Sequence, residues 1–289
     1  MAPAESRVTP LEHTAIGAGA GMLEVIVMQP MVAFKNALQE GRPLPRTPIA
    51  LYRGLVINCC SMAPITASQF GTSRMLEQAI TRYTGNDITS AGRFVSAAAA
   101  GSVSALIGSP TELIIIQQQK KLTPLVQEAK HFFSTYPATS IYRGLAPCIG
   151  RETLYAAGYL GLCPVLYDTL REKDYSPSTS MIASGIIGGV FAAAASHPFD
   201  TVKTRMQAYM YSKPEYLTSA ATARTIYAEG GPLNFWRGLL PRMTRIIGAT
   251  FLLINVRAAV VGYLEEQRDP KLNGSAAAAE AALAAASGP

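Results

Sequence analysis

The sequence predicts an all-α membrane protein built from three repeats of two helices, and two recurring patterns lead to this prediction. An aromatic-Arg-Gly triplet occurs three times, about 90 residues apart, as Tyr52-Arg53-Gly54, Tyr142-Arg143-Gly144 and Trp236-Arg237-Gly238. Each triplet follows a proline that lies inside an apolar stretch, namely Pro30, Pro110 and Pro198. Copies of one signature in matching phase are typical of a chain made from internal repeats.

The apolar segments are long enough to cross a bilayer. They run roughly over residues 12–39, 55–81, 90–119, 145–172, 179–209 and 239–265. Each exceeds the roughly 20 residues that a spanning helix needs. Charged residues make up only 15% of the chain, below the roughly 25% of a soluble domain. Glycine and alanine crowd the first, third and fifth segments, which favours close helix packing in lipid.

The segments between paired spans predict short surface helices near 122–134 and 215–228. In the first repeat the equivalent segment is shorter and rich in proline. We expect one domain over residues 1–266 and an alanine-rich tail over 267–289, the domain being divided into repeats at about 10–85, 86–175 and 176–266.

The charge pattern argues for a membrane protein and against a nucleic-acid-binding one. The net charge is +6, and the basic residues gather in the connectors that carry the triplets, as in a positive-inside bias. Four cysteines lie within apolar segments and three histidines are scattered, so neither a metal site nor a disulfide framework is expected. The sequence offers no convincing arrangement of a nucleophile and a base, so an enzyme is not expected. The first dozen residues lack a secretory signal, so targeting information is expected within the mature protein.

The proline motifs resemble those of the mitochondrial carrier family, in which Pro-x-acid-x-x-base is followed by a glutamine nine residues after the proline. The resemblance covers about residues 10–266. The third repeat matches fully, with Pro198, Asp200, Lys203 and Gln207; the second has Pro110, Glu112, Ile115 in place of the base, and Gln119; the first has Pro30, Val32 in place of the acid, Lys35 and Gln39.

This resemblance implies a fold, a location and an activity. The family fold is a barrel of six transmembrane helices with pseudo-threefold symmetry and short surface helices on the matrix side. Family members are multi-pass proteins of the mitochondrial inner membrane that carry solutes. Substrate would bind midway between a matrix-side gate and a cytosol-side gate, and no cofactor is expected.

The same resemblance implies a matrix-side gate made of ion pairs. In the family the acid of one odd helix pairs with the base of the next, which gives Glu112 with Lys203 and Asp200 with Lys35. Val32 and Ile115 would face each other, so both members of one pair are apolar and no charge is stranded. Braces beneath the gate are expected from Gln39, Gln119 and Gln207. The alternative is that the ion pairs are static structural contacts.

The triplets are candidate cardiolipin sites. A glycine at a helix start exposes backbone N–H groups to an anion, and in the family such positions hold cardiolipin. The matching residues are Arg53, Gly54, Arg143, Gly144, Arg237 and Gly238. A simpler interpretation is a helix start with an arginine at the lipid interface.

The substrate site is predicted by counting from each triplet glycine. Seven residues later lie Ser61, Arg151 and Arg245, on three even-numbered helices at one level. Guanidinium groups bind carboxylates in bidentate fashion. Glu152 would either bind an ammonium group or pair with an arginine, whereas Asn58 would supply a hydrogen bond. Glu24, an intramembrane acid, is either a substrate contact or a structural partner of an arginine.

Two functions remain open at this point. The first is a secondary transporter of a small carboxylate or an amino-acid-like metabolite, with bound cardiolipin. The second is a degenerate carrier fold that serves as a structural subunit of a respiratory assembly, because the cytosol-side gate motif is poorly kept. Its nearest match, Tyr167, Asp168 and Arg171, is shifted by four residues.

Overall fold

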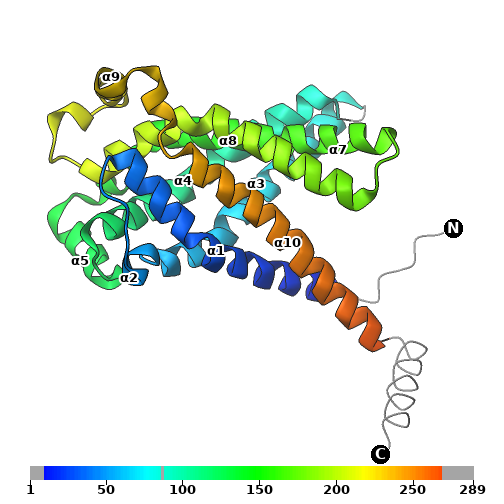
Figure 1. The fold of residues 1–289 in the computed structure, drawn as a ribbon. Helices are drawn as coiled ribbons and strands as arrows, with labels where there is room; N and C mark the ends of the chain where they lie inside the picture. Colours follow the sequence, from blue (N-terminus) through cyan, green and yellow to red (C-terminus); the bar gives the residue numbers. More distant parts are fainter. Residues whose placement is uncertain (1–9, 86–87, 269–289) are drawn as a thin grey trace, which may run out of the picture. The chain divides into compact units, whose positions relative to one another are not determined.

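The computed structural model describes residues 10–85 and 88–268, which form two compact units. The larger unit is Val25–Thr250. The smaller unit contains the start of α1 (Pro10–Glu40), up to Glu24, and the end of α10 (Leu239–Arg268), from Phe251 onward. The described residues form helices and loops without a strand (Figure 1), which confirms the all-α class.

Five helices in the described part of the chain are long and apolar enough to cross a membrane, and they coincide with five of the six predicted segments. They are α1, α3 (Leu55–Thr84), α4 (Ser90–Lys121), α8 (Pro177–Tyr209) and α10. The repeat prolines lie inside α1, α4 and α8. Proline removes a backbone hydrogen bond from a helix interior and bends the helix there.

The remaining predicted segment, 145–172, is helical throughout but is not one α-helix. It consists of α6 (Leu145–Ala156), the π-helix η2 (Ala157–Leu162) and α7 (Cys163–Glu172). A Cβ atom on Gly158 would lie 2.4 Å from Cβ of Ala192 on α8. The π-helix therefore forms where the helix axes approach closely, and π-segments of this kind often occur at functional sites.

Short elements connect the long helices, as the sequence predicts. They are α2 (Pro48–Leu51), α5 (Leu125–Thr135), α9 (Ser219–Gly230) and the 3₁₀ turns η1 (Ala138–Tyr142), η3 (Pro214–Tyr216) and η4 (Pro232–Trp236). The triplet glycines all have positive φ, at 85°, 78° and 87° for Gly54, Gly144 and Gly238. Glycine adopts this left-handed conformation without steric cost, which explains why each triplet ends in glycine.

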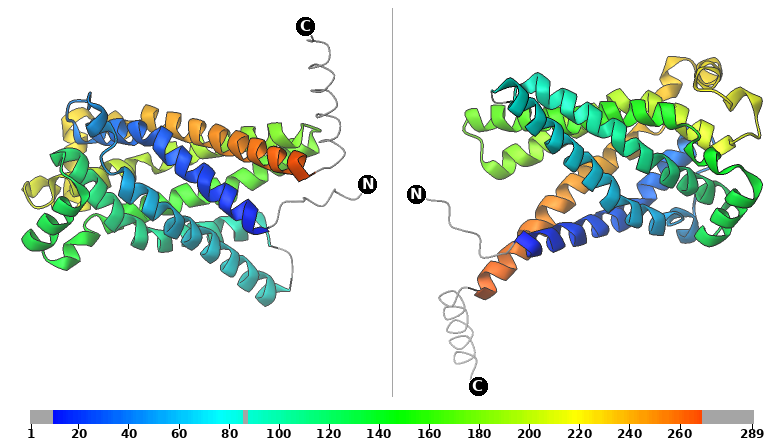
Figure 2. Two further views of the ribbon diagram at one scale, coloured as in Figure 1. Left: turned by 90° about the horizontal axis from the view of Figure 1, so that it is seen from below. Right: turned by 180° about the vertical axis from the view of Figure 1, so that it is seen from behind.

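Within the larger unit α3 packs on α4, α4 on α6, and α6 on α8 (Figure 2). Small residues allow these approaches: a Cβ atom on Gly101 of α4 would lie 2.3 Å from the carbonyl oxygen of Glu152 on α6.

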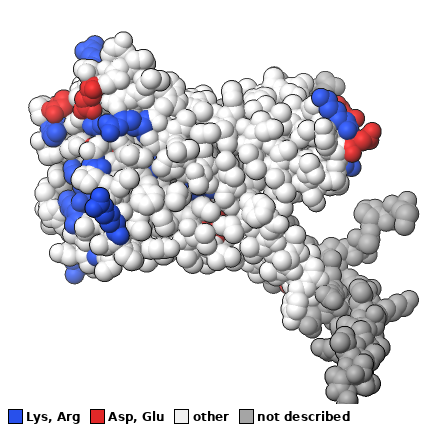
Figure 3. Space-filling model, in the orientation of Figure 1, with Lys and Arg blue, Asp and Glu red and all other residues white. Residues whose placement is uncertain are grey.

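Lysine and arginine side chains gather over the end that carries α2, α5 and α9 (Figure 3). This distribution is the one that the basic connectors predict.

We expect the contact at Gly101 to be needed for stability. Gly101→Ala should lower the free energy of unfolding by about 1–3 kcal/mol, because the added methyl group meets backbone that has no room to move. Gly71→Ala is the matched control, since a Cβ atom there would meet nothing within 4 Å. Thermal unfolding of the detergent-solubilised variants measures both effects. Equal melting temperatures for the two variants would contradict this packing.

Candidate functional site

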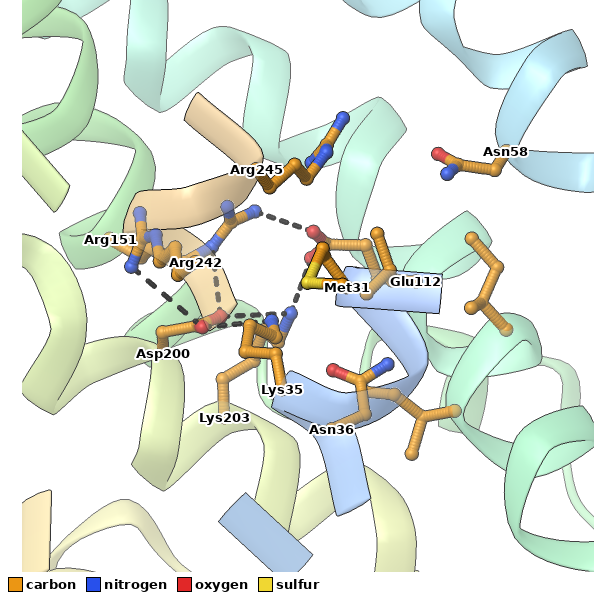
Figure 4. Close-up of a pocket in the computed structure, with 13 residues that line it drawn as sticks. Met31, Lys35, Asn36, Asn58, Glu112, Arg151, Asp200, Lys203, Arg242 and Arg245 are labelled. Atoms are coloured by element: carbon orange, nitrogen blue, oxygen red, sulfur yellow. Dashed lines mark hydrogen bonds and ion pairs between the residues drawn. The ribbon is translucent and has the colours of Figure 1, made fainter. Parts of the chain in front are cut away.

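A cavity of about 90 Å³ lies in the larger unit, and all six long helical segments contribute to its lining (Figure 4). The lining residues are Met31, Val32, Lys35 and Asn36 of α1, Asn58 of α3, Glu112, Ile115 and Ile116 of α4, Arg151 of α6, Asp200 and Lys203 of α8, and Arg242 and Arg245 of α10.

The two ion pairs that the sequence predicts are present at this cavity. Lys35 Nζ lies 2.9 Å from Asp200 Oδ2, and Lys203 Nζ lies 2.6 Å from Glu112 Oε2. Val32 and Ile115, which replace the third pair, both line the same cavity. Each charge of these two pairs thus has a partner of opposite sign, which a low-dielectric interior requires.

Asp200 is surrounded by more cations than its motif predicts. Besides Lys35, its carboxylate lies 3.5 Å from Lys203 Nζ, 3.6 Å from Arg151 Nε and 3.7 Å from Arg242 Nη1. Gln39 Nε2 also donates a hydrogen bond to Oδ2, at 2.9 Å. The side chain of Asp200 is 1% exposed. This carboxylate therefore joins α1, α6, α8 and α10 within the larger unit.

Arg151 belongs to the ion-pair cluster, although the sequence assigns it to substrate alone. Its Nη2 donates to Glu112 Oε1 at 2.8 Å and also pairs with Glu152. Glu152 further accepts a hydrogen bond from Gln69 Nε2, at 3.2 Å. The carboxylate of Glu152 is thus already engaged, and Glu152 does not line the cavity.

The other predicted substrate residues are distributed unevenly. Arg245 lines the cavity and lies on the opposite side of the cluster from Lys203 in Figure 4. Asn58 also lines it and donates Nδ2 to Gln29 Oε1 at 2.9 Å. Ser61 is buried beside it and donates to the Asn58 carbonyl oxygen at 3.1 Å. Glu24 belongs to the smaller unit.

Arg242 is a cavity residue that the sequence reasoning missed. Its Nη2 donates to Ser196 Oγ at 2.8 Å, and its Cζ lies 5.5 Å from the centre of the Tyr155 ring. Arg242 follows Gly238 by four residues, as Asn58 follows Gly54. Counting four as well as seven residues from each triplet glycine would have identified it, because these positions are neighbours on one helix face.

Two of the three brace glutamines, one on α4 and one on α8, donate a hydrogen bond to the backbone of a triplet arginine. Gln119 Nε2 donates to the Arg53 carbonyl oxygen at 3.2 Å, and Gln207 Nε2 donates to that of Arg143 at 3.1 Å. In the third triplet His197 Nε2 lies 3.1 Å from the Arg237 carbonyl oxygen instead. Gln39 is therefore left to bond Asp200.

The three triplet arginines differ in exposure. Arg143 is buried and donates Nε to the Met206 carbonyl oxygen at 3.0 Å and Nη2 to that of Tyr216 at 2.7 Å. Arg53 is half-buried and Arg237 is exposed. Of the predicted cardiolipin contacts, Arg237 therefore offers the most accessible guanidinium.

The segment proposed for the cytosol-side gate follows the π-helix η2. Asp168 lies in α7 and its Oδ2 is 3.8 Å from Arg93 Nη1 of α4. Both side chains are substantially exposed. A π-helix adds one residue to a turn, so η2 changes the face that α7 presents relative to an uninterrupted α-helix.

The comparisons with known proteins agree with this architecture. A family model described as mitochondrial carrier protein matches residues 173–267. The chain is 29% identical over 294 residues to mitochondrial succinate-fumarate transporter 1 of Arabidopsis thaliana, covering 90% of this chain and 95% of that protein. It is 26% identical over 267 residues to the mitochondrial dicarboxylate/tricarboxylate transporter of the same plant, covering 83% and 90%.

A shorter match reaches a relative of another kind. Over 174 residues the chain is 32% identical to the mitochondrial glutathione transporter of Homo sapiens, which covers 55% of this chain and 51% of that protein. Together with the repeated proline motifs and paired apolar helices, these matches define a membrane carrier made of repeats. The chain is thus similar to mitochondrial carriers over most of its length, and residues 173–267 match the family model. It is accordingly a multi-pass protein of the mitochondrial inner membrane.

Reversing the charge of Lys203 should destabilise the protein strongly. Lys203→Glu removes a buried pair and adds a second acid beside Glu112, so we expect a loss of about 3–5 kcal/mol. Adding Glu112→Lys should restore only part of this, because Arg151 would then face a lysine. Thermal unfolding in detergent measures the series.

The matched control is Lys213→Glu, the same reversal at a side chain that is 47% exposed. Exposed pairs contribute about 0–1 kcal/mol, so this control should unfold near the parent temperature. A Lys203→Glu protein as stable as the control would show that the Glu112 pair is not formed.

Proposed function

We propose that this protein is a secondary transporter that moves a small di- or tricarboxylate across the mitochondrial inner membrane by alternating access. The observation that carries the proposal is the charge of the cavity. Five cationic side chains and two carboxylates line it: Lys35, Arg151, Lys203, Arg242 and Arg245 against Glu112 and Asp200. An excess of positive charge inside a membrane protein favours the binding of anions.

The kind of cation indicates the kind of anion. Three of the five are arginines, whose planar guanidinium groups bind carboxylates through two parallel hydrogen bonds. Arg151 and Arg245 occupy equivalent positions, seven residues after their triplet glycines. They therefore supply contacts from two different repeats for the two ends of a dicarboxylate.

The relatives support the same class of substrate. Two that match nearly the whole chain are named for succinate and fumarate and for di- and tricarboxylates. Glu152, the candidate partner for a substrate ammonium group, is already bound to Arg151 and Gln69. This arrangement favours carboxylates without an amino group over amino acids.

The cavity is too small for the proposed substrate, so substrate binding requires the helices around it to move apart. About 90 Å³ is well below the roughly 300–1,000 Å³ of small-molecule binding pockets, so a dicarboxylate needs a wider site. A substrate carboxylate that binds Arg151 competes with Glu112 for the same guanidinium. Binding therefore weakens the ion pairs that hold the helices together, and the more open state is favoured by its stronger binding of substrate. This process involves no covalent chemistry, so the protein is proposed as a transporter rather than an enzyme.

The alternative of a structural subunit in a respiratory assembly is less well supported. The poorly kept cytosol-side motif favours it, whereas the cation-lined cavity has no use in a scaffold. Cardiolipin remains part of the proposal as a bound lipid at the triplets, with Arg237 as its most exposed arginine.

A ligand-dependent thermal shift tests the proposal. Succinate and citrate should raise the melting temperature of the detergent-solubilised protein, and acetate should do so far less. At 100 times the Kd, a ligand stabilises the folded state by about 2.7 kcal/mol. Arg151→Ala and Arg245→Ala should each abolish the shift, and Lys at either position should restore it only weakly, because an ammonium group cannot form the paired hydrogen bonds.

The matched control is Arg224→Ala, at an exposed arginine of α9, which should respond like the parent. If succinate stabilises the Arg151→Ala, Arg245→Ala double variant as well as the parent, the substrate site lies elsewhere. If no carboxylate stabilises the parent, and the protein co-purifies at fixed stoichiometry with a respiratory complex, the structural-subunit function is correct.

A further inference from the structure

A second pocket, of about 430 Å³, lies between the end of α1, the loop that follows it, the end of α4 and Tyr209 of α8. We call it the matrix vestibule, since α2, α5 and α9 lie on the matrix side in this family. Its lining residues are Glu40, Arg42, Pro43, Pro45, Arg46, Thr47, Ala50, Gln119, Lys120, Leu122 and Tyr209.

The matrix vestibule is positively charged. Its three cations, Arg42, Arg46 and Lys120, face a single lining carboxylate, that of Glu40. Glu40 is buried and already paired, because its Oε2 accepts a hydrogen bond from Arg42 Nε at 3.0 Å. Arg46 is exposed and forms no ion pair with the part of the chain that the structure describes. The pocket therefore presents cationic groups that are not neutralised.

A further cation lies beside the aromatic wall of this pocket. Lys120 Nζ and Lys213 Nζ lie 4.1 Å and 4.6 Å from the centre of the Tyr209 ring. The hydroxyl of Tyr209 donates to the Glu40 carbonyl oxygen at 3.2 Å, which fixes the ring in place. Positive groups that converge on one concave surface raise the local concentration of anions.

One hydrogen-bonded pair connects the matrix vestibule to the central cavity. Asn36 lines the central cavity and Gln119 lines the vestibule. Asn36 Nδ2 donates to Gln119 Oε1 at 2.6 Å, and both side chains are buried. This neutral contact thus links the linings of the two pockets, and Asn36 is the chain neighbour of Lys35 in the matrix-side gate.

We propose that the matrix vestibule is a second anion-binding site, which holds the substrate carboxylate on the matrix side before the Asn36–Gln119 contact opens. The proposal rests on the proposed function and adds a matrix-side site to it. The vestibule is several times larger than the central cavity, so it has room for a small di- or tricarboxylate while the ion pairs remain closed. Binding there is weak and rapidly reversible, since most of the cations are partly exposed to water.

Transport kinetics measured separately from each side test this site. Proteoliposomes of determined orientation are given labelled succinate on the side of α2, α5 and α9 or on the opposite side. Arg46→Gln should raise the KM for succinate from the α2 side by about two- to fivefold, the effect typical of an exposed charge. The KM from the opposite side and both maximal rates should stay unchanged. Lys120→Gln should act in the same direction.

Two controls have the same change of charge on the same side of the protein. Lys130→Gln on α5 and Arg224→Gln on α9 alter exposed residues outside the matrix vestibule. They should leave both KM values at the parent level. An equal rise in all four variants would assign the effect to general surface charge and would overturn the proposal.

The remaining outcomes separate this proposal from the transport function on which it rests. If the parent carries no carboxylate, the proposed function itself fails. If the parent transports succinate and Arg46→Gln leaves its KM unchanged from both sides, only the matrix vestibule is refuted. If that unchanged KM is accompanied by loss of the stabilisation that cardiolipin-containing vesicles give the parent, the pocket binds a lipid phosphate instead, and the proposal is wrong.

Discussion

The buried carboxylate of Asp200 is the charge on which the arrangement of the larger unit depends. Lys35, Lys203, Arg151 and Arg242 lie between 2.9 and 3.7 Å from its oxygens, and they come from four different helices. Cations at this density repel one another in a low-dielectric interior unless an acid lies among them. Asp200, together with Glu112 and Glu152, therefore allows cations from four helices to lie around one cavity.

The same cations take part in closing the cavity and in binding its ligand. Arg151 contacts Glu112 and approaches Asp200, yet it also lines the space in which substrate is proposed to bind. The guanidinium group of Arg151 is already paired with protein carboxylates. An incoming substrate carboxylate would therefore bind it by replacing one of these carboxylates as its partner. Such an exchange couples ligand binding to helix separation without a separate trigger. The matrix vestibule is proposed as a second site for the same anion, on the side of α2, α5 and α9.

Much of this architecture could be predicted from periodicity. The repeat phase and the apolar segments located the helices. The resemblance to the carrier family implied that Asp200 meets Lys35 and Glu112 meets Lys203, and both pairs are present in the structure. The sequence pattern did not predict features that depend on contacts between helices. The π-helix η2 lies just before Pro164, which cannot donate the backbone hydrogen bond of a continuous α-helix, and beside α8 at Gly158. Arg151 lies seven residues from its glycine, as predicted, but its contact with Glu112 depends on the distance between α6 and α4. That distance is set by the close approach of the two helices at Gly101.

A structure of the protein with succinate bound tests the central claim most directly. The distance between Arg151 Nη2 and Glu112 Oε1 is 2.8 Å in this structure. If substrate binds by exchange of ion-pair partners, this distance should exceed hydrogen-bonding range in the complex, with a succinate carboxylate in place of Glu112 at the guanidinium. Succinate bound in the cavity with the Arg151–Glu112 contact intact would contradict the account.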